Sequence, residues 1–318
     1  MKVLITGIAG FIGSHMAEYL NKKGYVVDGV DNFNPYYSVK LKKINADNLI
    51  KKGISVIEGD LRNDTLYDRL EKDYQFIIHF AAQPGISATS SFDSYLTNNL
   101  IATQKLIEFT KKQKSFIQFI NISTSSVYGD YATKSEKAVP QPTSYYGVTK
   151  LAAEQLVLAE ARKKEFRACS LRLYSVYGPR ERPDKLYTKL IKASLNHTQF
   201  PLFEGSKQHK RSFTYVEDIV NGIYLCLKKQ KLTNLEIINI GHHKQETTEQ
   251  GILCVEKLLK KHISIELKPA RESDQKETVA NITKARNLFG YNPKTNLEEG
   301  IQHQIDWFKT TIEDHGEF

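Results

Sequence analysis

Short, almost wholly apolar runs alternate with longer amphipathic segments through the first half of the chain. Continuously apolar runs of this length are typical of parallel strands that are buried on both faces. The runs that we predict as strands are Val3–Thr6, Val26–Val30, Ser55–Glu58, Phe76–Phe80, Phe116–Ile122 and Ala168–Leu173.

Helical periodicity fills the intervals between these runs, most clearly over Ile12–Lys22, Ser94–Lys111 and Tyr146–Arg162. Strands that alternate with helices form parallel sheets through right-handed crossovers. The expected fold is therefore α/β, a doubly wound, parallel Rossmann-type sheet.

The second half is less regular. The loop sequence GPRERPDK breaks the alternation, and a strand–helix segment follows over Ser212–Lys229, with a strand at Glu236–Ile240 and a final helix near Glu298–Lys309. We expect a smaller, discontinuous C-terminal domain that covers the strand ends. We expect residues 1–174 and 213–241 to form a dinucleotide-binding domain, and residues 175–212 and 242–318 to form a substrate-binding domain.

Composition narrows the function classes. The 318 residues carry a net charge of +9, but the lysines are scattered and no basic stretch is interleaved with aromatic residues, so we expect no nucleic-acid partner. No apolar run approaches the roughly 20 residues that cross a bilayer. The opening MKVLITG predicts a strand and no signal peptide, so a cytoplasmic protein is expected. The three cysteines have no metal-ligand spacing, and neither zinc nor a disulfide is expected.

A glycine-rich turn follows the first predicted strand. Gly7, Gly10 and Gly13 permit a tight turn and a close approach of backbone to a pyrophosphate, and the helix that follows offers its N–H groups to the phosphates. Asp31 ends the second strand, where a carboxylate binds ribose hydroxyls and repels a 2′-phosphate. This pattern predicts NAD as the cofactor.

A tyrosine and a lysine lie four residues apart in SYYGVTKLAAEQ, so Tyr146 and Lys150 share one face of the predicted helix, whereas Tyr145 points elsewhere. A free phenol with a pKa near 10 is a poor base, and lowering that pKa to near 7 requires about 4 kcal/mol. A nearby ammonium and the positive charge of NAD⁺ could together stabilise the phenolate by this amount. The pair therefore predicts redox chemistry on a hydroxyl group.

With its GxxGxxG turn and YxxxK pair, the chain resembles the extended short-chain dehydrogenase/reductase family along nearly its whole length. The resemblance implies that Thr124, four residues before the tyrosine of VYG, shares the substrate proton with Tyr146. It also implies a set of further cofactor contacts: Phe11, Ile12, Asn32, Asp60, Leu61, Ala81, Ala82, Gln83 and Asn99, with Asp60 and Leu61 at the adenine.

Two serines indicate the type of reaction. Nucleotide-sugar 4,6-dehydratases carry STDEVYG and UDP-glucuronate decarboxylases carry STSEVYG, whereas this chain has Ser125 and Ser126 at the variable positions. Without a carboxyl group there, general acid–base help for elimination is missing. The resemblance then implies C4 oxidation to a 4-keto sugar, rotation of the ketone, and reduction from the other face, which is epimerisation.

The substrate expectation is a UDP-sugar. Arg211 in KRSFTYVEDI, and Arg271 with Asp274 in ARESD, resemble the family's pyrophosphate-binding residues. The segments DNFNPYYSVKLK and RLYSVYGPRERPD resemble UDP-glucuronate 4-epimerases, which implies that Ser175 and Arg182, with Ser125 and Ser126, hold a sugar carboxylate.

The chain also departs from that pattern. These epimerases usually have an arginine shortly after the AAQAG turn, where this chain reads QPGISA, and a glycine stands where this chain has Glu181.

Four interpretations stay open at this point. UDP-glucuronate epimerisation leads, followed by 4-epimerisation of UDP-glucose or UDP-N-acetylglucosamine, a dehydratase or decarboxylase, and a catalytically idle NAD-binding scaffold or redox sensor. Intact Tyr146, Lys150 and Thr124 disfavour the scaffold. The resemblance also implies a homodimer that pairs through Ser94–Lys111 and Tyr146–Arg162.

Overall fold

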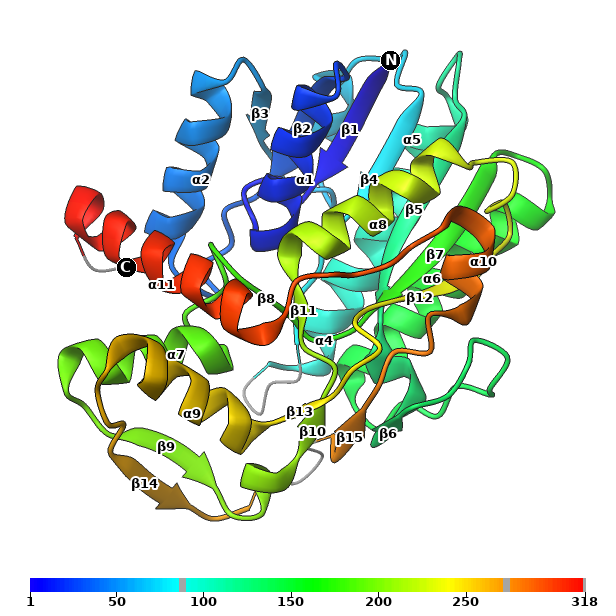
Figure 1. Ribbon diagram of the computed structural model, residues 1–318. Coiled ribbons are helices and arrows are strands. Elements are labelled where there is room, and N and C mark those ends of the chain that lie inside the picture. The colour runs from blue at the N-terminus through cyan, green and yellow to red at the C-terminus, as the bar shows by residue number, and fades with distance from the viewer. Residues whose placement is uncertain (86–89, 271–274, 317–318) are drawn as a thin grey trace.

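A seven-stranded sheet, parallel at every pairing, forms the centre of the computed structural model, which describes residues 1–85, 90–270 and 275–316 (Figure 1). In spatial order its strands are β12 (Ile237–Ile240), β7 (Arg167–Leu173), β5 (Gln118–Thr124), β4 (Phe76–His79), β1 (Lys2–Thr6), β2 (Val26–Asp31) and β3 (Ser55–Glu58). The order reverses at β1, as in Rossmann-type folds, so the expected fold class is confirmed.

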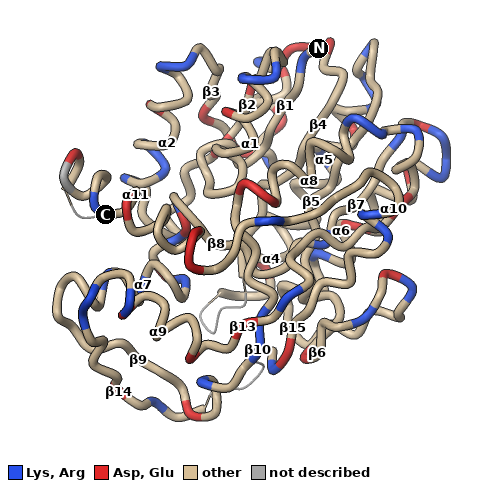
Figure 2. The backbone as a smooth tube through the Cα atoms, in the orientation of Figure 1, with Lys and Arg blue, Asp and Glu red and all other residues tan. Residues whose placement is uncertain are grey.

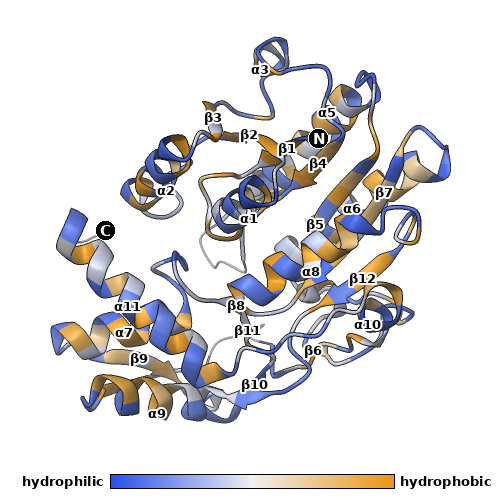
Figure 3. Cartoon of the chain, turned by 45° about the horizontal axis from the view of Figure 1, so that its top comes forward, coloured by the Kyte–Doolittle hydropathy of each residue, from blue (hydrophilic) through white to orange (hydrophobic). Residues whose placement is uncertain are grey.

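The central strands are buried along their length because helices cover both faces of the sheet, and Figure 3 shows them coloured as hydrophobic. The predicted strands agree with the observed ones to within two residues at each end. The largest shift is in β5, which continues to Thr124 because its ladder with β7 extends to the pair Thr124–Leu173. Thr124 is therefore the last residue of a central strand.

Helices of one face are α1 (Phe11–Lys22) and α8 (Val216–Lys228), which contact each other, and α2 (Val39–Lys51) lies beside α1. The other face carries α5 (Ala102–Lys111) and α6 (Tyr145–Arg162) (Figure 1). Short elements that complete this part are α3 (Asp64–Asp68), η2 (Ser125–Tyr128), β6 (Tyr131–Ala132) and α10 (Thr283–Phe289).

The predicted helix over Ser94–Lys111 is not a continuous α-helix. It begins as α4 (Phe92–Tyr95), widens into the π-helix η1 (Leu96–Ile101) and continues as α5. A π-segment of this kind inserts extra backbone and often occurs at functional sites. The widened turn contains Asn98 and Asn99, which both lie near the candidate site described below.

A second lobe follows β7 and is shown at the lower left of Figure 1. Its helices are α7 (Leu186–Asn196), α9 (Thr248–Leu259) and α11 (Leu297–His315), which contact one another. Its short strands are β8 (Val176–Tyr177), β9 (Phe200–Phe203), β10 (Lys210–Arg211), β11 (Thr214–Tyr215), β13 (Glu246–Thr247), β14 (Ile265–Lys268) and β15 (Glu277–Thr278), with η3 (Ser206–Gln208). Between them the chain returns to the large sheet through α8 and β12.

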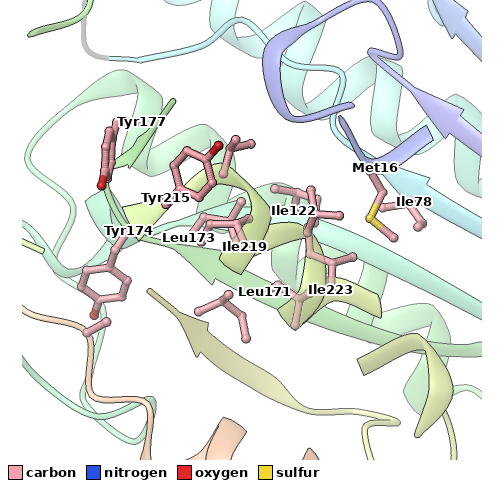
Figure 4. Packing of buried hydrophobic residues seen from close by; sticks show 14 of the residues in the cluster. Met16, Ile78, Ile122, Leu171, Leu173, Tyr174, Tyr177, Tyr215, Ile219 and Ile223 are labelled. Carbon is pink, nitrogen blue, oxygen red and sulfur yellow. The ribbon is translucent and has the colours of Figure 1, made fainter. Parts of the chain in front are cut away.

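One apolar core connects the sheet with this lobe. Figure 4 shows Met16 of α1, Leu171 of β7 and Ile223 of α8 in its central part. The same cluster continues to Leu202 of β9 and Val255 of α9 in the lobe. Among the described residues, no helix is both long and apolar enough to cross a bilayer.

Candidate active site

The large cavity lies where the carboxyl ends of β1, β2, β4, β5 and β7 face the second lobe, and its volume is about 610 Å³. Open α/β sheets bind ligands at this edge, close to the point where the strand order reverses. The predicted residues that line it are Gly7, Gly10, Phe11, Ile12, Gly13, Asp31, Asn32, Asp60, Leu61, Ala81, Ala82, Gln83, Thr124, Ser125, Ser126, Tyr146, Lys150, Ser175, Arg182 and Arg211.

In the glycine turn, the backbone at Gly7 lies close to the backbone at Ala81. Gly7 has φ +70°, and a Cβ there would lie 2.9 Å from the Ala81 nitrogen, while a Cβ on Gly13 would overlap the Gly7 carbonyl oxygen. Helix α1 begins at Phe11, and no side chain caps its N-terminus. Its first-turn N–H groups therefore face the cavity as donors for phosphate oxygens.

A buried carboxylate stands at the end of β2. Asp31 accepts the N–H groups of Ala9 (3.1 Å) and Phe33 (2.9 Å), which fix its orientation. Burial raises the pKa of Asp31 above its ordinary value, and the nearby Lys42 ammonium opposes this. With the glycine turn, this carboxylate matches the chemistry of a pyrophosphate joined to a ribose diol, so the residues fit NAD.

The carboxylate expected at the adenine is held by polar neighbours. Asp60 accepts the Asn32 amide (3.0 Å) and two guanidinium nitrogens of Arg62 (2.9 and 2.7 Å). These hydrogen bonds hold the pKa of the Asp60 carboxyl well below its usual range. Asp60 and Asn32 thus form one rigid part of the wall, next to Leu61.

Asn99 differs from its prediction, since it does not line the cavity. Its side chain is 1% exposed, its Oδ1 accepts the Gln83 N–H (2.7 Å) and its Nδ2 donates to Thr149 Oγ1 (3.0 Å). Asn99 therefore fastens the Gln83 turn to α6 from behind the wall. The neighbouring Asn98, which also belongs to the π-helix, lines the cavity.

Local sequence places the N-terminus of α6 against β5. Ser144 caps the helix by accepting the Gly147 N–H (3.1 Å), and a Cβ on Gly147 would lie 2.7 Å from the Ser126 carbonyl oxygen. Only a residue without a side chain allows this approach. Tyr146 therefore lies beside the end of β5, and Lys150 follows one turn deeper in the helix.

Tyr146, Lys150 and Thr124 converge in the cavity. Thr124 hydrogen-bonds the Tyr146 hydroxyl, and this bond and the Arg182 charge favour the phenolate. Burial is nevertheless the larger effect and raises the pKa of Tyr146, so the expected lowering is not achieved by the chain alone. Burial also lowers the pKa of Lys150 to about 8, against the opposing effect of Glu154.

Two serines follow Thr124 in η2. The Thr124 hydroxyl accepts the Ser126 N–H (3.1 Å) and lies within hydrogen-bond distance of Ser126 Oγ (3.2 Å), which sets the bend after the strand. Ser125 and Ser126 line the cavity next to Tyr146, and Ser175, directly after β7, lines it as well. These positions present neutral hydroxyl groups, with no carboxyl group.

Arg182 enters the cavity from the loop after β8. Its guanidinium lies over the Tyr36 ring (5.4 Å) and donates two hydrogen bonds to Asp184 (3.0 and 2.8 Å). Glu181, the residue before it, directs one oxygen to Thr188 and Gln304. Burial raises the pKa of Glu181 to about 7, which reduces the negative charge near Arg182.

Arg211 lies in the cavity wall on β10, whereas Arg271 and Asp274 lie outside the described residues. Several residues of the cavity wall were not predicted from the sequence: Tyr36, Tyr37, Lys42, Lys185, Lys189 and Phe200. The segment DNFNPYYSVKLK contains three of them, and its clustered aromatic residues were a usable signal. Figure 2 shows Lys and Arg spread over both parts of the molecule, so charge alone did not indicate the others.

Comparisons with known proteins show the family to which the chain belongs. The family model described as GDP-mannose 4,6 dehydratase matches residues 4–304. An uncharacterised UDP-glucose epimerase of Bacillus subtilis is 35% identical over 98% of both chains. UDP-glucuronate 4-epimerase 2 of Arabidopsis thaliana is 33% identical over 97% of this chain and 76% of that protein.

Among solved structures, the UDP-glucuronic acid 4-epimerase of Bacillus cereus, in complex with UDP-glucuronic acid and NAD, is similar throughout. It superposes with a TM-score of 0.91 at 36% sequence identity, over 98% of this chain and 99% of that one.

Proposed function

We propose that this chain, which belongs to the NAD-dependent nucleotide-sugar epimerase family of extended short-chain dehydrogenases, interconverts UDP-glucuronate and UDP-galacturonate. The chain is an NAD-dependent UDP-sugar 4-epimerase, and the proposal concerns which sugar it takes.

Three residues take part in the proton transfer at C4: Tyr146 transfers the proton, and Thr124 and Lys150 assist it. Bound NAD supplies a hydride acceptor and donor, and its positive charge adds to that of Lys150. As a phenolate, Tyr146 removes the C4 hydroxyl proton, and as a phenol it returns the proton after the ketone has turned in the cavity. Thr124 hydrogen-bonds Tyr146 and orients it toward the sugar hydroxyl. Burial opposes the phenolate of Tyr146, and we propose that the Lys150 ammonium on the same helix face helps to offset this.

The observation that carries the substrate proposal is the position of the Arg182 guanidinium. Arg182 is 8% exposed, lines the same cavity as Tyr146 and is near enough to lower its pKa. In UDP-glucuronate the carboxylate stands on C5, directly next to the C4 atom on which Tyr146 acts. A guanidinium suits a carboxylate through paired N–H donors, with Ser125 and Ser175 as neutral hydroxyl donors beside it.

A neutral sugar is the second candidate. Asp184 already accepts two hydrogen bonds from Arg182, which leaves fewer donors for a carboxylate, and the serines also suit a hydroxymethyl group. The similarity to a protein named as a UDP-glucose epimerase favours the same alternative. A dehydratase or decarboxylase is disfavoured because Ser125 and Ser126 supply no carboxyl group for elimination.

The test is incubation of the purified protein with UDP-glucuronate, UDP-glucose and UDP-N-acetylglucosamine, with products separated by chromatography and assigned by NMR. We expect UDP-galacturonate as the main product. Turnover of only the neutral sugars would refute the proposed substrate, and formation of UDP-xylose would indicate a decarboxylase. The Tyr146→Phe variant is the control, and we expect it to lose at least about a hundredfold in kcat.

We further propose a homodimer, a division into the two parts given above, and a cytoplasmic location. The support for the dimer comes from α4, η1 and α6, three helical elements that contact one another. They carry four exposed apolar side chains: Phe92, Ile101, Tyr145 and Val148. The rings of Phe92 and Tyr145 pack edge to face at 5.2 Å. We call these four residues the helix-pair surface.

A further inference from the structure

Lys185 lies in the cavity wall beside Arg182, although nothing in its sequence position assigned it a role. The two residues belong to one tight turn, because the Lys185 N–H donates to the Arg182 carbonyl (3.1 Å). Their cationic ends also converge. A Cβ built on Gly85 would lie 3.2 Å from an Arg182 guanidinium nitrogen and 3.8 Å from Lys185 Nζ. Both cations therefore approach the same point above the Gly85 turn.

Without Lys185, this turn would offer no net positive charge to an anionic ligand. Arg182 forms a two-bond ion pair with Asp184 (2.8 Å at the shorter contact), so the pair by itself is close to neutral. Glu181 is directed toward Thr188 and Gln304. Lys185 thus supplies the net positive charge that a carboxylate ligand needs next to Arg182. The Lys185 side chain is exposed at the cavity wall. Desolvation by the surrounding protein and the Arg182 charge lower its pKa to about 8, so the ammonium form prevails at pH 7.

Helix stability does not explain a lysine at this position. Lys185 is the N-cap of α7 and makes no capping hydrogen bond. Serine, threonine, aspartate and asparagine are preferred at N-caps, and the positive end of a helix dipole disfavours a cation there. Residues that break a local rule are frequent at functional sites.

We propose that Lys185 is a specificity-determining residue whose ammonium, together with Arg182, binds the carboxylate of the uronate substrate. The inference rests on the proposed function, since only a uronate offers a carboxylate at this place. Lys185 then distinguishes UDP-glucuronate from UDP-glucose, because the two ligands share the uridine, the pyrophosphate and C4. Its contribution is to ground-state affinity, and the proton transfer stays with Tyr146.

The experiment measures dissociation constants by calorimetry for NAD-loaded protein at pH 7. The Tyr146→Phe background prevents turnover, and the ligands are UDP-glucuronate, UDP-glucose and UDP. For Lys185→Gln we expect the affinity for UDP-glucuronate to fall about tenfold relative to that for UDP-glucose. Lys185→Arg keeps the charge and should restore most of this ratio. Lys192→Gln removes an equal charge from α7 at a position outside the cavity wall, and should leave the ratio within about twofold.

Two results would overturn the inference. An unchanged ratio in Lys185→Gln would mean that Lys185 does not contact the carboxylate, and an equal loss for all three ligands would assign Lys185 to the pyrophosphate. Conversion of a uronate is tested independently of this ratio, in the turnover assay with the protein that retains Tyr146. If UDP-galacturonate forms while the ratio does not change, only the role of Lys185 is wrong. If no uronate is converted, the proposed function is wrong.

Discussion

The carboxyl group of Glu181 is buried next to Arg182, and its ionisation costs free energy. One oxygen accepts hydrogen bonds from Thr188 (3.0 Å) and Gln304 (2.8 Å), yet desolvation raises the pKa to about 7, well above the ordinary value. A carboxyl with a raised native pKa favours the folded state fully at pH values below its unfolded pKa. That contribution is lost as the pH rises through about 7.

Glu181→Gln should therefore stabilise the protein at pH 8 and have little effect at pH 5. The amide oxygen of glutamine can accept the same hydrogen bonds without carrying a charge. We expect a gain on the order of 2 kcal/mol in the free energy of unfolding at pH 8, measured by urea denaturation at both pH values. A destabilisation at pH 8, or an equal gain at both, would contradict the burial effect.

At the scale of single elements, α6 is attached to β7 by a buried ion pair. Arg172 is 1% exposed and donates two hydrogen bonds to Glu154 (3.0 and 2.6 Å), and Glu154 also accepts the Ser170 hydroxyl (3.1 Å). Removal of one partner leaves the other charge buried without compensation. This pair fixes the helix that carries Tyr146 and Lys150.

Glu154→Gln should lower the free energy of unfolding by about 3–5 kcal/mol, because Arg172 keeps its charge in the core. Glu160→Gln is the matched control on the same helix. Its partners Lys111 and Lys163 are partly exposed, so we expect a loss below about 1 kcal/mol. Similar losses for the two variants, in chemical denaturation of the purified proteins, would show that the Glu154 pair does not anchor α6.

The sequence predicted elements well where one physical signal dominates. The β4 and β5 strands are apolar runs buried on both faces, and α6 is a long segment rich in the helix formers Ala, Leu and Glu, so their bounds were found within two residues. The π-helix η1 was missed because widening by one residue leaves the hydrophobic period nearly intact. Helix α7 and strand β9 in the second lobe were missed as well, because their stability depends on packing between distant segments.

The candidate site was predictable where a motif fixes backbone geometry, as at Gly7, Asp31 and Tyr146. Asn99 lies behind the cavity wall while its neighbour Asn98 lines the cavity, an arrangement within the π-helix that the sequence did not predict. Lys185 was not recognised because its role depends on the ion pair between Arg182 and Asp184, a contact that no spacing rule predicts.

For the whole molecule, the proposed dimer makes a prediction about the helix-pair surface. Val148 is 44% exposed on α6, on the side opposite the cavity-facing residues, and Val148→Lys would bring a charge into the interface. We expect wild-type dimers and Val148→Lys monomers in light scattering at micromolar concentration. Val139→Lys is the control, since Val139 is 78% exposed in the loop before α6. A monomeric wild type would contradict the proposal.

The continuous apolar core has a consequence for how the molecule unfolds. Its side chains come from the sheet and from the second lobe, and the chain leaves the sheet after β7 and returns to it at β12. If either part unfolded alone, the other would lose side chains that complete its apolar core. Heat should thus produce one cooperative transition. A ligand that binds only the native state raises the free energy of unfolding of the whole molecule, by about 2.7 kcal/mol at a hundredfold excess over Kd. Occupancy of the cavity by a ligand is in this sense coupled to the folding of the second lobe.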